Sequence, residues 1–283
     1  MGKKKVSVLD IQKRKDQGKR LTMVTAYDLS SARLVDGAGI DMILVGDSLG
    51  MVMLGYRTTV PVTMDDMVHH AKAVARGAKR SFLVGDLPFM AYQADRAEAL
   101  RNAGRLMKEG RMDAVKLEGG GQDTTTIRAM VAAGIPVMGH VGLTPQSISQ
   151  LGGYRIQGRT SESARRLLDD ALALEAAGCF AIVLELVPAP VAQIVSERLE
   201  VPTIGIGAGT GCDGQVLVYH DMLGLFEDFQ PRFVKRFAEL GPVITEALST
   251  YRQEVETGQF PTAEHSFEMP EEELAAFRES IED

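Results

Sequence analysis

Residues 36–50 read DGAGIDMILVGDSLG, and this stretch contains the pattern that decides the fold. A glycine-rich helix end precedes the apolar run 42–45, and the polar residues Asp47 and Ser48 follow it. Four further glycine joints precede apolar runs in the same way, at residues 76–78, 108–110, 132–134 and 176–178. We expect glycine at each joint to end a helix with a positive φ angle, which it adopts without strain. The recurring order of helix, glycine and strand predicts a βα repeat.

Eight short apolar runs predict eight strands, at residues 21–25, 42–45, 82–84, 114–117, 137–139, 181–184, 203–206 and 215–218. Near-continuous apolar runs are typical of parallel strands that are covered on both faces. Segments of helical length separate most of them, although residues 207–214 are too few for a full helix. The pattern predicts an α/β protein with the architecture of a TIM-type (β/α)8 barrel.

Helices are also expected at both ends of the chain. Residues 5–18 predict an amphipathic helix that caps the bottom of the barrel, and residues 231–255 predict one or two helices of a C-terminal helical extension. The tail from Glu268 is strongly acidic. We therefore expect a single catalytic barrel domain, residues 1–266, and an exposed acidic C-terminal tail, residues 267–283.

The composition indicates a globular protein without a nucleic-acid partner. The 283 residues are 45% hydrophobic, carry a net charge of −7 and include no tryptophan. A nucleic-acid-binding surface would require a basic patch with aromatic side chains for stacking. Nucleic acid is therefore not expected as a partner, and small-molecule substrates are expected instead from the charged site predicted at the strand ends.

The sequence also predicts a cytoplasmic location. No run approaches the ~18 apolar residues of a membrane span, and the lysine-rich start has no signal-peptide cleavage site. The two cysteines, Cys179 and Cys212, are too few for a disulfide framework. We expect Cys179 to pack in the core, and neither cysteine to be a nucleophile.

Charged residues cluster where the predicted strands end. Asp47, Asp86 and Glu118 each follow an apolar run, and Lys116 lies two residues before Glu118. In a parallel barrel these ends form one rim, where active sites lie. Three carboxylates in a dry cavity would repel one another unless a cation lay among them. Because oxygen ligands without clustered Cys or His favour a hard ion, we predict a Mg²⁺ site, with Lys116 as a further positive charge.

Some of these residues also have simpler explanations. Asp47 or Asp86 alone could be a loop residue or the N-cap of the following helix, whereas the whole charged set favours a functional site. The glycine run 205–211 lacks the spacing of a dinucleotide-binding motif. It fits either close approach of the backbone to a ligand or a tight turn.

Two more residues complete the predicted site. Glu185 lies in the apolar run 182–187, where desolvation should raise its pKa towards the range of a general base. A structural salt bridge of an inward-facing carboxylate is the alternative. His140 follows Gly139 at another predicted strand end and could orient a substrate or donate a hydrogen bond.

Several motifs resemble those of one family. They are VGDSLG at 45–50, DLPFM at 86–90, VKLEGG at 115–120, GHVGLTPQ at 139–146, GGYRIQGR at 152–159, GIGAG at 205–209 and DGQ at 213–215. In these motifs the chain resembles the ketopantoate hydroxymethyltransferases, and the resemblance covers roughly residues 5–266.

The resemblance implies a Mg²⁺-dependent transfer of a one-carbon unit from 5,10-methylenetetrahydrofolate to 3-methyl-2-oxobutanoate, which forms 2-dehydropantoate for pantothenate and coenzyme A. It implies Asp47, Asp86 and Glu118 as metal ligands and Glu185 as the proton acceptor. It also implies that the keto acid is contacted by Asp47, Ser48, Asp86 and Lys116. Members of the family form homo-oligomers, often decamers.

Two rival interpretations remain. The first is a barrel of the phosphoenolpyruvate mutase and isocitrate lyase type, which also uses Mg²⁺ and a 2-oxo acid but often carries a reactive cysteine in an active-site loop. The second is a non-catalytic barrel that serves as a binding or scaffold protein, which should have lost a metal ligand or the base. The residues Asp47, Asp86 and Glu185 are all present, which favours an enzyme.

Overall fold

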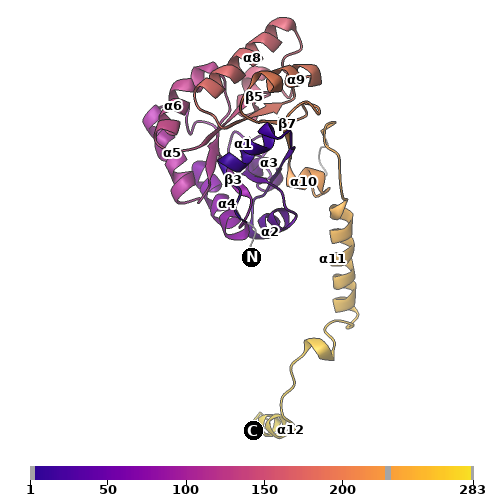
Figure 1. Ribbon diagram of the computed structural model, residues 1–283. Helices are drawn as coiled ribbons and strands as arrows, with labels where there is room; N and C mark the ends of the chain where they lie inside the picture. The colour runs from indigo at the N-terminus through magenta and orange to yellow at the C-terminus, as the bar shows by residue number, and fades with distance from the viewer. Residues whose placement is uncertain (1–3, 227–230, 282–283) are drawn as a thin grey trace. The chain divides into compact units, whose positions relative to one another are not determined.

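The computed structural model describes residues 4–226 and 231–281 (Figure 1). The chain divides into two compact units, Met1–Phe237 and Ala238–Asp283. The first unit contains the strands, and the regular elements in the described part of the second unit, up to residue 281, are helices. The predicted boundary between residues 266 and 267 lies inside the second unit and stays a prediction about domain organisation.

Parallel strands close into a barrel in the first unit, in the order β1 to β8 along the chain. Pairing of β1 with β8 closes the barrel, with Leu21 opposite Gly214. This confirms the predicted fold, and the strands differ from the expected ranges by a few residues at their ends. Their bounds are β1 Leu21–Thr25, β2 Met42–Val45, β3 Phe82–Asp86, β4 Ala114–Lys116, β5 Val137–Gly142, β6 Ala181–Glu185, β7 Thr203–Ile206 and β8 Gly214–Leu217.

Helices surround the barrel on its outer side (Figure 1). Side chains of Asp28, Thr63 and Thr160 accept backbone hydrogen bonds at the starts of three of them, and each such cap stabilises a helix by about 1 kcal/mol. As expected, no helix separates β7 from β8. The longer helices are α2 Leu29–Gly37, α4 Met64–Gly77, α5 Arg96–Lys108, α6 Thr124–Ala132, α8 Ser161–Ala176 and α9 Ala189–Arg198, and the short ones are α3 Leu49–Val52, α7 Ile148–Leu151 and α10 Tyr219–Met222.

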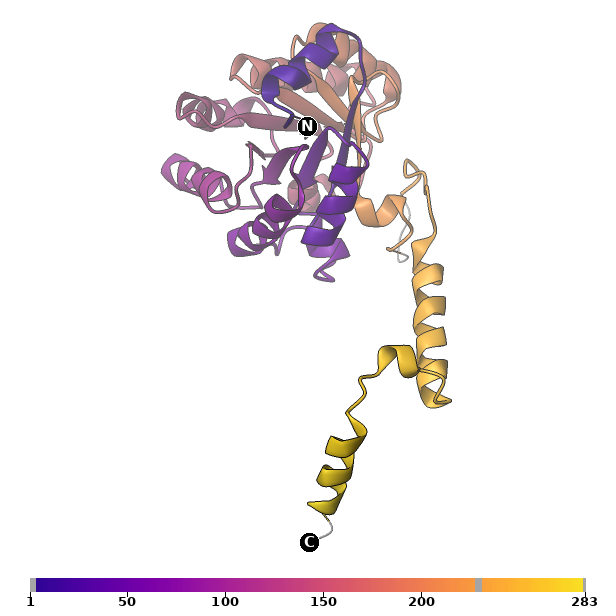
Figure 2. The ribbon, with the colours of Figure 1, turned by 60° about the horizontal axis from the view of Figure 1, so that its bottom comes forward.

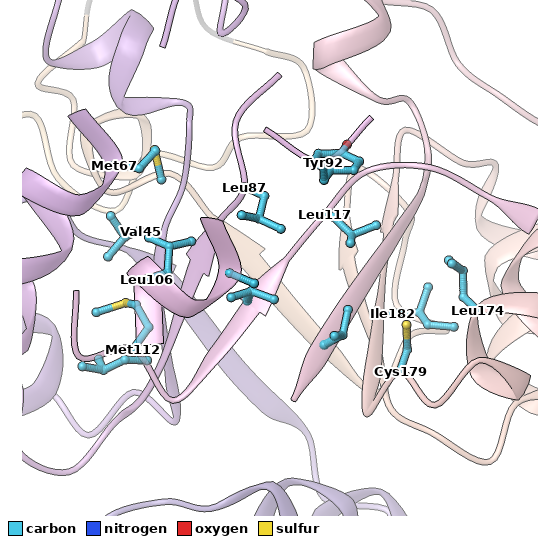
Figure 3. Close-up of a cluster of buried hydrophobic side chains, with 14 of the residues drawn as sticks. Val45, Met67, Leu87, Tyr92, Leu106, Met112, Leu117, Leu174, Cys179 and Ile182 are labelled. Atoms are coloured by element: carbon cyan, nitrogen blue, oxygen red, sulfur yellow. The ribbon is translucent and has the colours of Figure 1, made fainter. Parts of the chain in front are cut away.

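The first helix, α1 Val8–Asp16, closes one end of the barrel as predicted (Figures 1 and 2). Its Ile11 is fully buried and packs with interior side chains such as Leu21, Met42 and Val183. Burial of a side chain of this size stabilises the fold by about 1.5–3 kcal/mol. A second apolar cluster fills the space between the strands and the outer helices, where Leu106, Leu174 and Ile182 lie (Figure 3).

The glycine joints serve two different purposes. Gly39, Gly134 and Gly178 have positive φ angles of 83°, 84° and 100°, as predicted. Gly77 and Gly110 do not, and there the prediction was wrong. A Cβ atom at Gly77 would lie 2.6 Å from the carbonyl oxygen of Leu29, and one at Gly110 would lie 2.6 Å from that of Leu106. Close packing of α2 against this helix end therefore explains Gly77. At Gly110 the end of its own helix α5 and Cβ of Ala71 on α4, which would lie 3.0 Å away, leave no room for a side chain.

The second unit contains α11 Leu240–Glu256 and α12 Glu271–Glu279. Helix α11 begins nine residues later than the earliest start predicted at residue 231, because the described residues 231–237 pack against the barrel instead, where Val234 is buried. The acidic tail forms α12, which was not expected. No helix in the described ranges combines the length and the apolar character that a membrane crossing requires.

Candidate active site

The predicted site residues line one cavity at the carboxyl ends of the strands. Its volume is about 400 Å³, within the range of ~300–1,000 Å³ that is common for small-molecule sites. Strands β2 to β6 and the residues directly after them contribute the charged side chains that were predicted from the sequence. The cavity brings together every residue predicted from the sequence, namely Asp47, Ser48, Asp86, Lys116, Glu118, His140 and Glu185.

Asp86 links Asp47 to Lys116. Its Oδ1 accepts a hydrogen bond from Nζ of Lys116 at 2.6 Å, and its Oδ2 accepts one from the backbone N–H of Asp47 at 3.2 Å. Burial would lower the pKa of Lys116, but the surrounding carboxylates, Asp86 foremost, outweigh burial and raise that pKa, so the amine is charged. Burial and the charge of Asp86 raise the pKa of Asp47 to about 7. Lys116 alone does not neutralise this cluster.

His140 lies between two carboxylates. Its Nε2 is 3.3 Å from Oε2 of Glu185, and its Nδ1 is 3.6 Å from Oε1 of Glu118. Both contacts are longer than a well-formed hydrogen bond. Burial and the nearby charge of Lys116 lower the pKa of His140, so the ring is neutral and has one N–H to donate. His140 can therefore orient either glutamate.

Glu185 lies at the wall of the cavity. It is the last residue of β6 and its side chain is 15% exposed, so the full burial expected from the apolar run is not observed. Among the described residues, no lysine or arginine nitrogen lies within 4.0 Å of its carboxylate. The alternative of a structural salt bridge therefore lacks a partner, and Glu185 is accessible to a ligand.

Gln146 and Tyr92 form a buried network behind the carboxylates, and sequence reasoning assigned no role to either. The backbone N–H of Gln146 donates to Oε2 of Glu118, and its side-chain Nε2 donates to Oδ2 of Asp47, both at 2.9 Å. The hydroxyl of Tyr92 donates to the carbonyl oxygen of Glu118 at 2.7 Å. Burial, followed by the charge of Asp47, raises the pKa of Glu118. In the sequence, Gln146 was noted only as the last residue of the GHVGLTPQ motif, and no sequence pattern indicated a role for Tyr92.

Ser48 is held by a second tyrosine. Its hydroxyl lies 2.8 Å from that of Tyr27, which is completely buried. Burial raises the pKa of Tyr27, so the phenol keeps its proton. Ser48 is thereby fixed beside Asp47 at the cavity wall.

The simpler explanation of Asp47 and Asp86 as helix N-caps does not hold, although Asp47 does lie in the turn between β2 and α3. The N-cap of α3 is Ser48, and its side chain makes no capping hydrogen bond. Asp86 ends β3, while α5 begins later with Asp95 as its N-cap. Neither aspartate therefore caps a helix.

The glycine run is explained by packing. A Cβ atom at Gly209 would lie 2.4 Å from Cβ of Ala189, and one at Gly211 would lie 2.6 Å from Cβ of Gln193, so this loop packs tightly on α9. The cysteines are buried, as expected for Cys179, and burial raises the pKa of both thiols. Neither Cys179 nor Cys212 lines the cavity.

The donor set suits a hard divalent cation. Asp47 and Asp86 are adjacent and buried, and among the side chains that the structure describes Lys116 is the one cation paired with them. Mg²⁺ commonly binds one or two carboxylates together with substrate oxygens and water. Within the described ranges, no group of three or more His, Cys, Asp or Glu side chains is arranged to hold a metal ion. Glu118 is already engaged by Gln146.

Comparison with known proteins agrees with the motifs. The family model described as ketopantoate hydroxymethyltransferase matches residues 5–263. A 3-methyl-2-oxobutanoate hydroxymethyltransferase of Moorella thermoacetica is 59% identical over 263 residues, which cover 93% of this chain and 98% of the relative. One of Chloroflexus aurantiacus is 57% identical, with 96% of each chain covered.

Solved structures show the same fold at low identity. A phosphonopyruvate hydrolase superposes with a TM-score of 0.60 at 14% identity and covers 98% of this chain and 96% of its own. A 2,3-dimethylmalate lyase of the PEP mutase/isocitrate lyase superfamily gives 0.57 at 16% identity, with 96% and 98% covered. At such identity the likeness extends to the barrel alone, whereas the family match spans most of the sequence. The chain belongs to the ketopantoate hydroxymethyltransferase family.

Proposed function

We propose that this enzyme transfers a hydroxymethyl unit from 5,10-methylenetetrahydrofolate to 3-methyl-2-oxobutanoate, forming 2-dehydropantoate on the route to pantothenate. Family membership and the names of the relatives support the reaction. The observation in this chain that carries the proposal is the cavity in which the Lys116–Asp86 pair and Glu185 lie together. It offers one charged group for an anionic keto acid and a separate carboxylate for its proton.

The keto acid would bind at the ends of β2 to β4. The charged amine of Lys116 would pair with the substrate carboxylate, and the hydroxyl of Ser48 would donate a hydrogen bond to a substrate oxygen. Asp47 and Asp86 lie beside them at the cavity wall. Because these side chains are held by Gln146, Tyr27 and one another, the substrate would meet a site that is already ordered.

Glu185 would accept the proton from C3 of the keto acid. The C3–H electron pair then delocalises into the adjacent carbonyl, and C3 attacks the methylene carbon of the folate. The bonds of that carbon to the two folate nitrogens, N10 and N5, break in turn. N10 leaves and takes up the proton from Glu185 as C3 attacks, and water then displaces N5, which takes one water proton while the hydroxyl oxygen stays on the carbon. The neutral ring of His140, 3.3 Å from Glu185, would orient the base.

A Mg²⁺ ion would be held by Asp47 and Asp86, with Glu118 as the third proposed member of the set. When bound, it would supply positive charge to stabilise the negative charge that develops on the keto oxygen. This assignment is supported by the two buried, adjacent aspartates, where burial and the charge of Asp86 raise the pKa of Asp47 and a cation would relieve the repulsion.

Turnover tests the proposed function. Purified enzyme should form 2-dehydropantoate from both substrates in the presence of Mg²⁺, and EDTA should abolish the activity until Mg²⁺ is added back. Phosphonopyruvate and 2,3-dimethylmalate should not be cleaved. Absence of product from well-folded protein, or cleavage of either of these compounds, would overturn the proposal.

We further propose a homo-oligomeric, cytoplasmic enzyme, a decamer by resemblance to the family. Apolar side chains on α11 are exposed in the single chain, which supports burial against another copy, and sedimentation velocity would measure the assembly. These side chains are Val243, Ile244, Leu248, Tyr251 and Val255.

A further inference from the structure

The cavity has an apolar part that the keto-acid site does not use. A small, anionic keto acid needs the charged strand ends, whereas this part presents hydrocarbon and aromatic surface after β6, β7 and β8 and on α3. Such a wall favours a larger ligand with a flat, weakly polar body. Its side chains are Met51, Leu186, Ile206, Val218, Phe226 and Phe233.

The wall is built by close packing. Gly207 has a φ angle of +63°, and a Cβ atom at this position would lie 3.0 Å from the ring of Phe233 and 2.9 Å from Leu186. The absence of a side chain at Gly207 lets the ring and Leu186 approach the backbone here. The apolar surface is therefore part of the folded barrel mouth.

One carboxylate, that of Asp221 on α10, lines the same cavity. Among the described residues, no side chain or backbone N–H donates a hydrogen bond to it at normal distance. Burial raises its pKa to about 6, an effect that Arg236 partly offsets. A half-buried carboxylate with free acceptor positions beside apolar walls matches a ligand that offers N–H donors.

The structure assigns Asp221 and the apolar wall to the pterin ring of the one-carbon donor, an inference that rests on the proposed function. The amino-pyrimidinone edge of a reduced pterin presents two adjacent N–H donors, which match the two oxygens of a carboxylate. The rest of the bicyclic ring is flat and can pack on Phe226, Phe233 and Leu186. Arg232 also lines the cavity and is exposed, so it is available to the carboxylates of the folate tail.

Differences in charge between the two parts of the cavity favour a different substrate in each part. Asp221 repels the anionic keto acid, which Lys116 and the proposed Mg²⁺ would attract together, and neither of these cations offers an acceptor to the N–H edge of a pterin. Each substrate is therefore directed to one part of a shared cavity, with the reacting methylene and C3 between them.

Replacement of Asp221 by Asn tests the assignment, because the amide loses one acceptor and turns an N–H group towards the pterin donors. The measurements are KM for 5,10-methylenetetrahydrofolate, and, without folate, the exchange of the C3 proton of 3-methyl-2-oxobutanoate with deuterium. We expect the folate KM to rise at least tenfold, while the exchange rate stays within twofold of wild type. The matched charge control is Asp169→Asn on the outer helix α8, which should change neither.

A second variant, Asp221→Cys, tests the assignment by chemical labelling, so that the test does not require an active Asp221→Asn enzyme. In Asp221→Cys the introduced thiol lies at the cavity and should react with a maleimide. The labelling should be specific to it, because the native Cys179 and Cys212 are buried. Tetrahydrofolate at a saturating concentration, well above the raised KM, should slow this labelling at least fivefold, and keto acid alone should not. The pterin assignment would be overturned if Asp221→Asn left the folate KM unchanged, or if it lowered the rate of proton exchange as much as it raised that KM. It would also be overturned if saturating tetrahydrofolate did not slow the labelling of Asp221→Cys. If the wild-type enzyme forms no 2-dehydropantoate, the proposed function itself fails.

Discussion

The side-chain amide of Gln146 fixes the carboxylate of Asp47, because its Nε2 donates a hydrogen bond to Oδ2 at 2.9 Å. The same nitrogen donates to the carbonyl oxygen of Leu87 at 2.9 Å. A flipped amide would place its oxygen against two acceptors, so the network determines the orientation. Gln146 does not line the cavity, and it therefore acts through Asp47 as a positioning residue.

Substitution of Gln146 by Met should lower kcat/KM by roughly 10- to 100-fold, since Met fills the space but donates no hydrogen bond to Asp47. Steady-state kinetics with each substrate, together with thermal unfolding, would measure the effect. The control is Gln93→Ala, because Nε2 of Gln93 lies 3.4 Å from Gln146 and contributes little. Equal losses in the two variants would show that Gln146 has no special role.

Substitution of Asp47 or Asp86 by Ala should weaken Mg²⁺ binding, because each removes a carboxylate from the proposed pair. Isothermal titration calorimetry measures the affinity directly. It should fall at least tenfold, and Asp169→Ala should leave it unchanged. If Mg²⁺ affinity were the same in both aspartate variants as in wild type, the ligand assignment would be wrong.

Gly77→Ala should destabilise the barrel by about 1–3 kcal/mol, the usual cost of overpacking. The added methyl would meet the carbonyl oxygen of Leu29 at 2.6 Å and Cβ of Ala32 at 2.8 Å. Gly37→Ala is the matched control, since nothing lies within 4 Å of its Cβ position. The control should be neutral or stabilising by up to about 1 kcal/mol, as chemical denaturation would show. A larger loss for Gly37→Ala than for Gly77→Ala would contradict the packing argument.

Sequence patterns predicted the barrel well because most of the parallel strands are buried on both faces and must be apolar, whereas β1 and β8 each expose one residue. The same patterns placed Asp47, Asp86 and Lys116 at one rim, because strand ends in a closed barrel converge. The start of α11 was less predictable, since Phe233 packs beside Gly207 and Val234 is buried, and these tertiary contacts replace a helix.

Side-chain contacts account for most of what the sequence did not reveal. Gly77 and Gly110 were predicted to have the positive φ angles of helix caps, but lack of space for a Cβ atom explains them, and their φ angles are not positive. The role of Gln146 depends on a hydrogen bond to a residue 99 positions away in the chain. Asp221 is an ordinary acidic residue in the sequence and becomes informative only when the apolar walls around it are known.

The central claim is that Glu185 removes the C3 proton of a keto acid held by the carboxylates and lysine of the neighbouring strands. Proton exchange of 3-methyl-2-oxobutanoate with deuterated water, followed by NMR with Mg²⁺ and without folate, tests this directly. We predict exchange by the wild-type enzyme and a loss of at least about 100-fold in Glu185→Gln, with keto-acid affinity within threefold of wild type. Exchange by Glu185→Gln at close to the wild-type rate would contradict the account.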